Sequence, residues 1–394
     1  MMLAQFAATG SVLPFVTMLF RERGLSYAQI SLLLTLSAAA MTVCPLLWGM
    51  AADRWISLNR VFSVVNAASA ALLGLMALGR GFALTAAAFT LYSACALPTF
   101  TLINALAFHH LPHPREQFGR LRAFGSLGWI LPFLPISLWT ARRPGAGLDF
   151  TLWLGAGLSL VSAAWAFALP PTRPGAARRG PGPNLYGRAL KRLLGNSDFT
   201  ALLLSMFLVA GAFSILLYYS PPYLEKLGVP RPWIGPIQAL GVVVEIGLFQ
   251  WHGRLARAVR PTVLILAGSS ALILRHLLYA FCGAPLWLSL SYALAAAVIV
   301  FHHTGVSLLS NALAGGELRA TSQTLLSFAG QGLGPMFAHW LAGRIAVRFG
   351  DDLRPIFLAA ALLCAAAFVI ILSRRRSLDR PSSLGEQTAA GAAR

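Results

Sequence analysis

Apolar residues occur along this chain in twelve separate runs, each about as long as a helix that crosses a bilayer. A hydrocarbon core about 30 Å thick needs about 20 helical residues at about 1.5 Å per residue. The predicted spans are 1–20, 26–51, 61–79, 84–108, 120–140, 149–169, 199–220, 232–252, 262–281, 286–310, 320–341 and 355–373. Barrel strands would alternate polar and apolar residues, and these runs do not. The pattern therefore predicts an all-α integral membrane protein.

Composition agrees with this prediction, since 57% of residues are hydrophobic and only 11% are charged. A typical soluble domain has roughly 25% charged residues. The formal charge of +19 does not indicate a nucleic-acid partner, because the basic residues are interleaved with the spans. With a cytoplasmic N-terminus, 20 of the 31 Lys and Arg residues fall on the inner side and 10 on the outer side. The positive-inside rule then predicts a multi-pass protein of the cell inner membrane with both termini cytoplasmic.

The N-terminus and the cysteines give two further expectations. Met1 lies at the edge of the first span without a signal-peptide cleavage pattern, so the natural start is expected to lie a few residues upstream. The four cysteines all lie inside spans and lack metal-like or paired spacing. We expect them to be packing residues, and we expect no metal and no cofactor.

A Pro-, Gly- and Arg-rich stretch at 170–198 divides the spans six and six. Its composition predicts an extended cytoplasmic linker. The expected domains are an N-terminal six-helix bundle at 1–169 and a C-terminal one at 199–373. The remaining residues, 374–394, are predicted to form a disordered cytoplasmic tail.

The two halves also resemble each other in sequence. A shift of 204 residues places Gly49 on Gly253 and Phe124 on Phe328, at equivalent spans. Such self-similarity is typical of a duplicated unit. The predicted fold is therefore twelve transmembrane helices in two pseudo-symmetric six-helix bundles.

The loop after the second span reads Gly49-Met-Ala-Ala-Asp53-Arg54. This loop, together with twelve spans in two halves, resembles the major facilitator superfamily, whose members are repeat-built transporters. The resemblance implies that Gly49 permits close helix approach and that Asp53 and Arg54 form charge contacts that hold a cytoplasmic gate. The alternative is an ordinary charged turn.

The segment 118–129 reads FGRLRAFGSLGW, and it resembles the start of the fifth span in the group of lactose, phenylpropionate and nucleoside proton symporters. On a helix, the spacing places Arg122, Ser126 and Trp129 on one stripe. The resemblance implies that Arg122 orients a substrate and that Trp129 stacks on its ring. The alternative is a flanking positive charge beside an ordinary buried aromatic residue.

One position departs from the pattern of that group. In the lactose permease group a carboxylate in the fourth span partners the arginine, whereas the same separation here leads to Asn104. Asn104 can form hydrogen bonds but cannot neutralise Arg122. This difference weakens a galactoside prediction and favours an anionic group on the substrate.

A second polar set lies in the C-terminal half. Glu245 is the one acidic residue well inside a predicted span, where a carboxylate is costly unless it is protonated or paired. Its segment resembles the eighth span of the phenylpropionate permease group, and Arg275, His302 and His303 complete a set similar to that of these symporters. We predict that the set carries the coupled proton, with Glu245 and a histidine closer in depth than Glu245 and Arg275. A core histidine bonded to a backbone carbonyl is the alternative for either His.

Sequence position also predicts which histidine points inward and where the helices can bend. His303 shares a polar stripe with Tyr292 and Ser307, so we expect His303, more than His302, to point into the protein.

Pro14 and Pro335 lie inside predicted spans and remove helix hydrogen bonds, so we interpret them as hinges. Ordinary packing kinks are the alternative.

The predicted function is a secondary active transporter that couples a proton to symport of a small organic acid with a planar or aromatic portion by alternating access. Symport of a sugar or nucleoside is the second hypothesis, and proton-driven export is the third. A membrane-embedded enzyme is a remote alternative, because nucleophile-elbow and zinc-ligand patterns are absent. A receptor or structural protein would not need the buried polar set. The expected partners are the substrate, protons and lipid, with the chain acting as a monomer.

Overall fold

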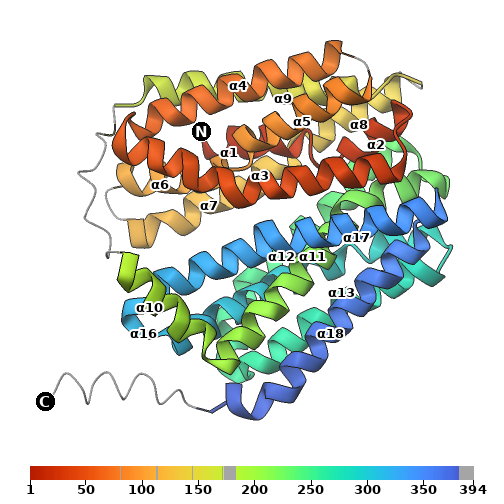
Figure 1. Ribbon diagram of the computed structural model, residues 1–394. Helices are drawn as coiled ribbons and strands as arrows, with labels where there is room; N and C mark the ends of the chain where they lie inside the picture. Colours follow the sequence, from red (N-terminus) through yellow and green to blue (C-terminus); the bar gives the residue numbers. More distant parts are fainter. Residues whose placement is uncertain (80, 112–113, 144, 171, 173–182, 381–394) are drawn as a thin grey trace, which may run out of the picture. The chain divides into compact units, whose positions relative to one another are not determined.

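The protein is described by a computed structural model of residues 1–394, except 80, 112–113, 144, 171, 173–182 and 381–394. Within the described residues, the regular elements are all helical (Figure 1). The helices of the first half are α1 (Met2–Gly10), α2 (Val16–Glu22), α3 (Tyr27–Arg54), α4 (Leu58–Leu78), α5 (Phe82–Ala96), α6 (Thr99–His110), α7 (Pro114–Ile130), α8 (Phe133–Arg142) and α9 (Asp149–Ala168).

The remaining helices include two π-helical segments, η1 and η2. They are α10 (Pro183–Leu194), α11 (Ser197–Lys226), α12 (Arg231–Ala258), α13 (Pro261–Phe281), α14 (Pro285–Leu290), α15 (Ala293–Ala297), η1 (Val298–His303), α16 (Thr304–Ser327), η2 (Phe328–Leu333), α17 (Gly334–Phe349) and α18 (Arg354–Leu378). The all-α fold is thus confirmed. Ten helical stretches of the described chain are long and apolar enough to span a membrane.

The two expected spans that are not among these ten are interrupted helices. Within 1–20, helix α1 ends at Gly10 and α2 begins at Val16, with turns between them. Pro14 lies in this break, where it has no N–H to donate to a carbonyl one turn earlier. Within 320–341, Pro335 follows the π-helical η2 in the first turn of α17. Both prolines therefore lie beside helix interruptions, and their action as hinges stays a prediction.

The chain forms two compact units. Unit 1 comprises Met1–Arg178, Leu217–Ala239 and His339–Leu353, and unit 2 comprises Arg179–Leu216, Leu240–Ala338 and Arg354–Arg394. Two stretches of the C-terminal half therefore belong to the same unit as the N-terminal half. The boundaries of the two predicted six-helix halves stay a prediction.

In unit 1, glycines let α1 and α7 approach until backbone meets backbone. A Cβ on Gly10 would lie 2.3 Å from the carbonyl oxygen of Trp129, and one on Gly128 would lie 2.3 Å from that of Leu3. No side chain fits at either point. In the same unit α4 packs along α9 (Figure 1).

Unit 2 repeats both features. A Cβ on Gly334 of α17 would lie 2.3 Å from the carbonyl oxygen of Phe207 in α11, and Phe207 is the residue 204 positions after Leu3. Likewise α13 packs along α18 (Figure 1), and these helices lie close to 204 residues after α4 and α9. The internal repeat predicted from the sequence therefore appears as the same helix pairs in each unit.

The predicted linker and tail are more helical than expected. Residues 183–194 of the linker form α10, because Leu193 is buried against Phe199 and Ala314 and so fixes one helix face. Residues 171 and 173–182 lie outside the described part. The start of the tail continues α18 to Leu378, where the Ser377 hydroxyl is hydrogen-bonded to Asp198. Residues 381–394 of the predicted tail lie outside the described residues.

One end of unit 1 is held together by contacts between residues from both halves of the sequence. Arg21 pairs with Asp351 at 2.9 Å, and Arg231 lies 3.4 Å from Glu22. Deeper in the unit, the hydroxyl groups of Ser31 and Tyr219 are 2.7 Å apart and both residues are buried. This end is the one that the charge distribution predicts to face outward.

We expect Gly10→Ala to lower the stability of the protein, because its methyl group would press on the Trp129 carbonyl oxygen. Overpacking of this kind costs about 1–3 kcal/mol. The matched control is Gly157→Ala in α9, where a Cβ meets no atom within 4 Å. Thermal unfolding of both variants in detergent tests this, and equal midpoints would contradict the close crossing of α1 and α7.

Candidate functional site

The N-terminal set is a chain of aromatic rings that ends in a cation. The guanidinium carbon of Arg122 lies 4.7 Å from the centroid of the Phe6 ring. The Phe6 ring lies 4.8 Å from that of Phe100, which lies 6.4 Å from the ring of Trp129. The structure therefore links Arg122 and Trp129 through two phenylalanines that the sequence analysis had not singled out. Phe6, Phe100 and Trp129 also pack in one hydrophobic cluster of the described residues, and the roles of Arg122 and Trp129 in substrate binding stay predictions.

Glycine also determines how Arg122 lies. A Cβ on Gly125 would be 2.7 Å from Nη1 of Arg122 and 3.2 Å from the Phe6 ring. The missing side chain thus leaves room for the guanidinium and the ring together. Ser126, on the predicted binding stripe, is half-buried.

Two side-chain oxygens of this half are buried without a hydrogen-bond donor among the described residues. They are Oδ1 of Asn104 and Oε1 of Gln5. The Gln5 amide nitrogen donates to the Thr99 hydroxyl at 2.6 Å, so its orientation is set. An unpaired buried acceptor is costly, so each oxygen favours a water or a hydroxyl-bearing ligand beside it.

The predicted gating motif lies at the C-terminal end of α3. Arg54 is exposed, and the side chain of Asp53 lies outside the described part. A Cβ on Gly49 would meet no atom within 4 Å, so Gly49 permits no close helix approach in this structure. The role of the three residues in a gate stays a prediction.

The two adjacent histidines of the C-terminal set differ in their surroundings. His302 is fully buried, and its Nε2 lies 2.9 Å from the Ser205 hydroxyl. His303 is half-buried with its ring edge-on to Phe213 at 6.0 Å, and its Nε2 has no partner among the described residues. Both lie in the π-helical η1, whose extra residue per turn changes side-chain directions.

Arg275 is 2% exposed, and its guanidinium carbon lies 4.1 Å from the centroid of the Tyr292 ring. Its Nε and Nη2 groups are buried without partners among the described residues. Glu245 is half-buried in α12. The structure thus places the guanidinium of Arg275 against aromatic rings.

Two further intramembrane histidines were missed by the sequence analysis. His276 is fully buried, with Nδ1 2.9 Å from the Leu272 carbonyl oxygen and Nε2 3.2 Å from that of Ala212. Carbonyl oxygens only accept, so both contacts are hydrogen bonds at once only when the ring is doubly protonated. His339 is also buried, with its ring 5.3 Å from that of Tyr218. The signal for both was an ionisable residue inside a predicted span.

In the described residues, no group of three or more His, Cys, Asp or Glu side chains is placed to hold a metal ion. The four cysteines are free, and only Cys364 is fully buried. The polar sets of the two halves therefore offer hydrogen-bond and charge chemistry.

Comparison with known proteins identifies the family. The model of the MFS_1 like family matches residues 1–359. The chain belongs to this family. It is 25% identical over 338 residues to the putative nucleoside transporter YegT of Escherichia coli, covering 82% of this chain and 77% of that protein. It is 25% identical over 379 residues to maltose permease of Geobacillus stearothermophilus, covering 94% and 92% of the two chains.

Solved structures agree with the fold. A crystal structure of the nucleoside transporter NupG has a TM-score of 0.82 and 18% identity, covering 94% of this chain and 96% of NupG. The protein is therefore a transporter of the major facilitator type with several membrane helices, as predicted. Its family and structural relatives are transporters, which supports the expectation that it is not an enzyme.

We expect Ser205→Ala to destabilise the protein, because it leaves Nε2 of buried His302 without its hydrogen-bond partner. The cost of an unsatisfied buried group is about 1–3 kcal/mol. The matched control is Ser373→Ala, which removes an exposed hydroxyl that bonds only to the Ile370 carbonyl oxygen. Thermal unfolding in detergent compares them, and an equal effect would show that the contact between His302 and Ser205 adds no stability.

Proposed function

We propose that the protein is a secondary active transporter that couples proton movement to symport of a small organic solute by alternating access. The observation that carries the proposal is the intramembrane polar set of Glu245, Arg275 and His303 in a chain of this family. Ionisable side chains in a bilayer are costly and are typically kept for ion or substrate movement. In this cycle, protonation of Glu245 favours substrate binding, and its deprotonation on the inner side favours release. Both termini are cytoplasmic in this proposal.

The contacts at one end of unit 1 support alternating access. Arg21 with Asp351 and Arg231 with Glu22 join residues from the two halves of the sequence. Exposed ion pairs of this kind are worth only about 0–1 kcal/mol each, so they can form and break within a transport cycle. We interpret this end as an outer gate in its closed state.

Two substrate classes fit the N-terminal set. A nucleoside carries a planar base for the aromatic row and hydroxyl groups for the buried oxygens of Asn104 and Gln5, and the relative YegT is described as a putative nucleoside transporter. An aromatic acid carries a planar ring and a carboxylate for Arg122. The named relatives support the nucleoside at least as well as the acid.

Glu245→Gln is expected to abolish proton-driven accumulation while keeping exchange of labelled for unlabelled solute across the membrane. Glutamine cannot release a proton, whereas exchange needs no net proton movement. Uptake of labelled uridine and of labelled 3-phenylpropionate into proteoliposomes, with and without a pH gradient, measures both processes.

Asp352→Asn, a loss of an exposed carboxylate, serves as the control and should keep accumulation. A Glu245→Gln protein that still concentrates either solute would remove Glu245 from the coupling step. Absence of any uptake by the unmodified protein, with both solutes and both gradient directions, would instead contradict the proposed substrates.

A pair of variants separates the two substrate classes. Arg122→Lys replaces a planar two-pronged donor by a point charge, and Asn104→Glu adds a carboxylate to the half that holds Arg122. If the substrate is an acid, each should weaken its affinity by roughly 10- to 150-fold, since a lost charged hydrogen bond costs about 1.5–3 kcal/mol. Titration of both solutes measures this. For a nucleoside substrate, Asn104→Glu should act no more strongly than the size-matched Asn104→Gln.

A further inference from the structure

A cavity of about 540 Å³ lies in unit 1, at the end that carries the Arg21–Asp351 pair. Small-molecule sites in proteins are typically about 300–1,000 Å³. The lining residues Glu22, Gly24 and Gly81 are exposed, so the cavity reaches the protein surface. Neither Arg122 nor any other residue proposed above for the substrate lines it.

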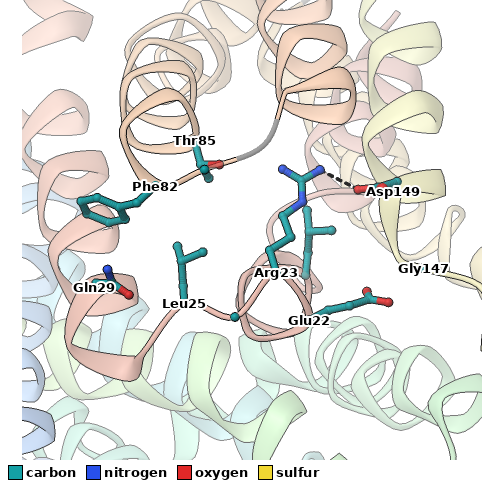
Figure 2. A pocket seen from close by; sticks show the side chains of 11 residues that line it. Glu22, Arg23, Leu25, Gln29, Phe82, Thr85, Gly147 and Asp149 are labelled. Carbon is teal, nitrogen blue, oxygen red and sulfur yellow. Dashed lines mark hydrogen bonds and ion pairs between the residues drawn. The ribbon is translucent and has the colours of Figure 1, made fainter.

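Arg23 places a buried guanidinium in the wall of this cavity. Its side chain is only 7% exposed, and Nη2 donates to Asp149 Oδ1 at 2.6 Å. The Nε and Nη1 groups have no partner among the described residues. Figure 2 shows the guanidinium between Asp149 and the side of the cavity that carries Thr85, with its other terminal nitrogen on the Thr85 side. Unpaired buried donors favour an acceptor-bearing ligand.

The charges around the cavity disfavour an anion as that ligand. Two carboxylates, Glu22 and Asp149, line the cavity together with Arg23. Glu22 already accepts from the Leu148 N–H at 2.9 Å and lies 3.4 Å from Nη1 of Arg231. Arg231 is shared between Glu22 and Glu225, and Arg23 pairs with Asp149. Both arginines are therefore already engaged by carboxylates, and an added anion would be repelled by Glu22 and Asp149.

The remaining wall is divided between apolar and polar groups. Leu19, Leu25 and Phe82 provide apolar surface, and Thr85 and Gln29 provide polar groups. In Figure 2 the Phe82 ring lies between Thr85 and Gln29, so apolar and polar groups alternate around the wall. A sugar ring presents the same two kinds of surface, with C–H groups on its faces and hydroxyl oxygens around its edge. Its oxygens can accept from Arg23 without adding charge to the cavity.

We propose that this cavity binds an uncharged polyhydroxylated molecule, a sugar or the sugar part of a nucleoside, with Arg23 as its principal hydrogen-bond donor. The site is separate from the residues proposed for transport. Its occupancy can therefore be measured whether or not the transport proposal holds.

Ligand protection of an introduced cysteine tests the site directly. Gln29→Cys places a thiol in the wall, and Phe82→Cys is a second reporter in case loss of the Gln29 hydrogen bond to the Ser26 N–H disturbs the helix start. The purified full-length protein in lipid nanodiscs is alkylated with a maleimide, and the rate at the introduced cysteine is read by mass spectrometry. Uridine and maltose are the neutral probes, 3-phenylpropionate is the anionic probe, and Ala141→Cys, exposed and outside the cavity lining, is the control position.

A neutral probe at about four times its dissociation constant should slow alkylation about fivefold at the cavity cysteine and leave the control position unchanged. Adding Arg23→Lys keeps a charge for Asp149 but removes the planar donors, so the affinity should fall about tenfold or more. Arg374→Lys, which alters another arginine paired with an aspartate in unit 2, should keep the protection.

Three results would overturn the proposal. The first is that neither uridine nor maltose protects the cysteine at concentrations up to about 10 mM, a limit far weaker than ordinary ligand affinities. The second is that 3-phenylpropionate protects as strongly as the neutral probes. The third is that the protection survives Arg23→Lys. None of them depends on uptake, so the transport proposal is tested separately by the Glu245→Gln experiment.

Discussion

A chain in hydrocarbon must pair every backbone N–H and C=O within the protein, and the rest of this structure depends on that constraint. It explains why the described elements are helices. It also explains where backbones come closest: a carbonyl oxygen of α1 or α11 faces a glycine, Gly128 or Gly334, on the crossing helix. In lipid, where apolar burial does not drive helices together, such close packing is a main source of association.

The same constraint limits where the helices can be interrupted. The break at 11–15 contains Pro14, the π-helical η1 ends at His303, and the π-helical η2 comes just before Pro335. Irregular backbone at membrane depth is tolerated where protein surrounds it, and π-helical turns are frequent at functional sites. The interruptions therefore coincide with the residues that the sequence marked as polar or hinge-forming.

The candidate site shows how far sequence reasoning reaches. Arg122 and Trp129 were recognised from helical spacing and family resemblance, but Phe6 and Phe100, which lie between them, come from other helices and carry no local signal. Depth predicted that Glu245 lies closer to a histidine than to Arg275, and the structure places the guanidinium of Arg275 against tyrosine rings. His276 was missed although it is adjacent in sequence. Spacing along one helix predicts a face, but the partner on the next helix depends on packing.

The lipid environment, the all-helical class, the internal repeat and the family could be predicted from the sequence, because length, apolarity and period are properties of contiguous residues. The helix in the predicted linker and the contact between His302 and Ser205 became visible only in the folded chain. The same holds for the pair of Arg23 and Asp149, which are 126 residues apart and line one cavity. The physical reason is that side-chain contacts in lipid follow from helix crossing points, and these are set by small residues on two helices at once.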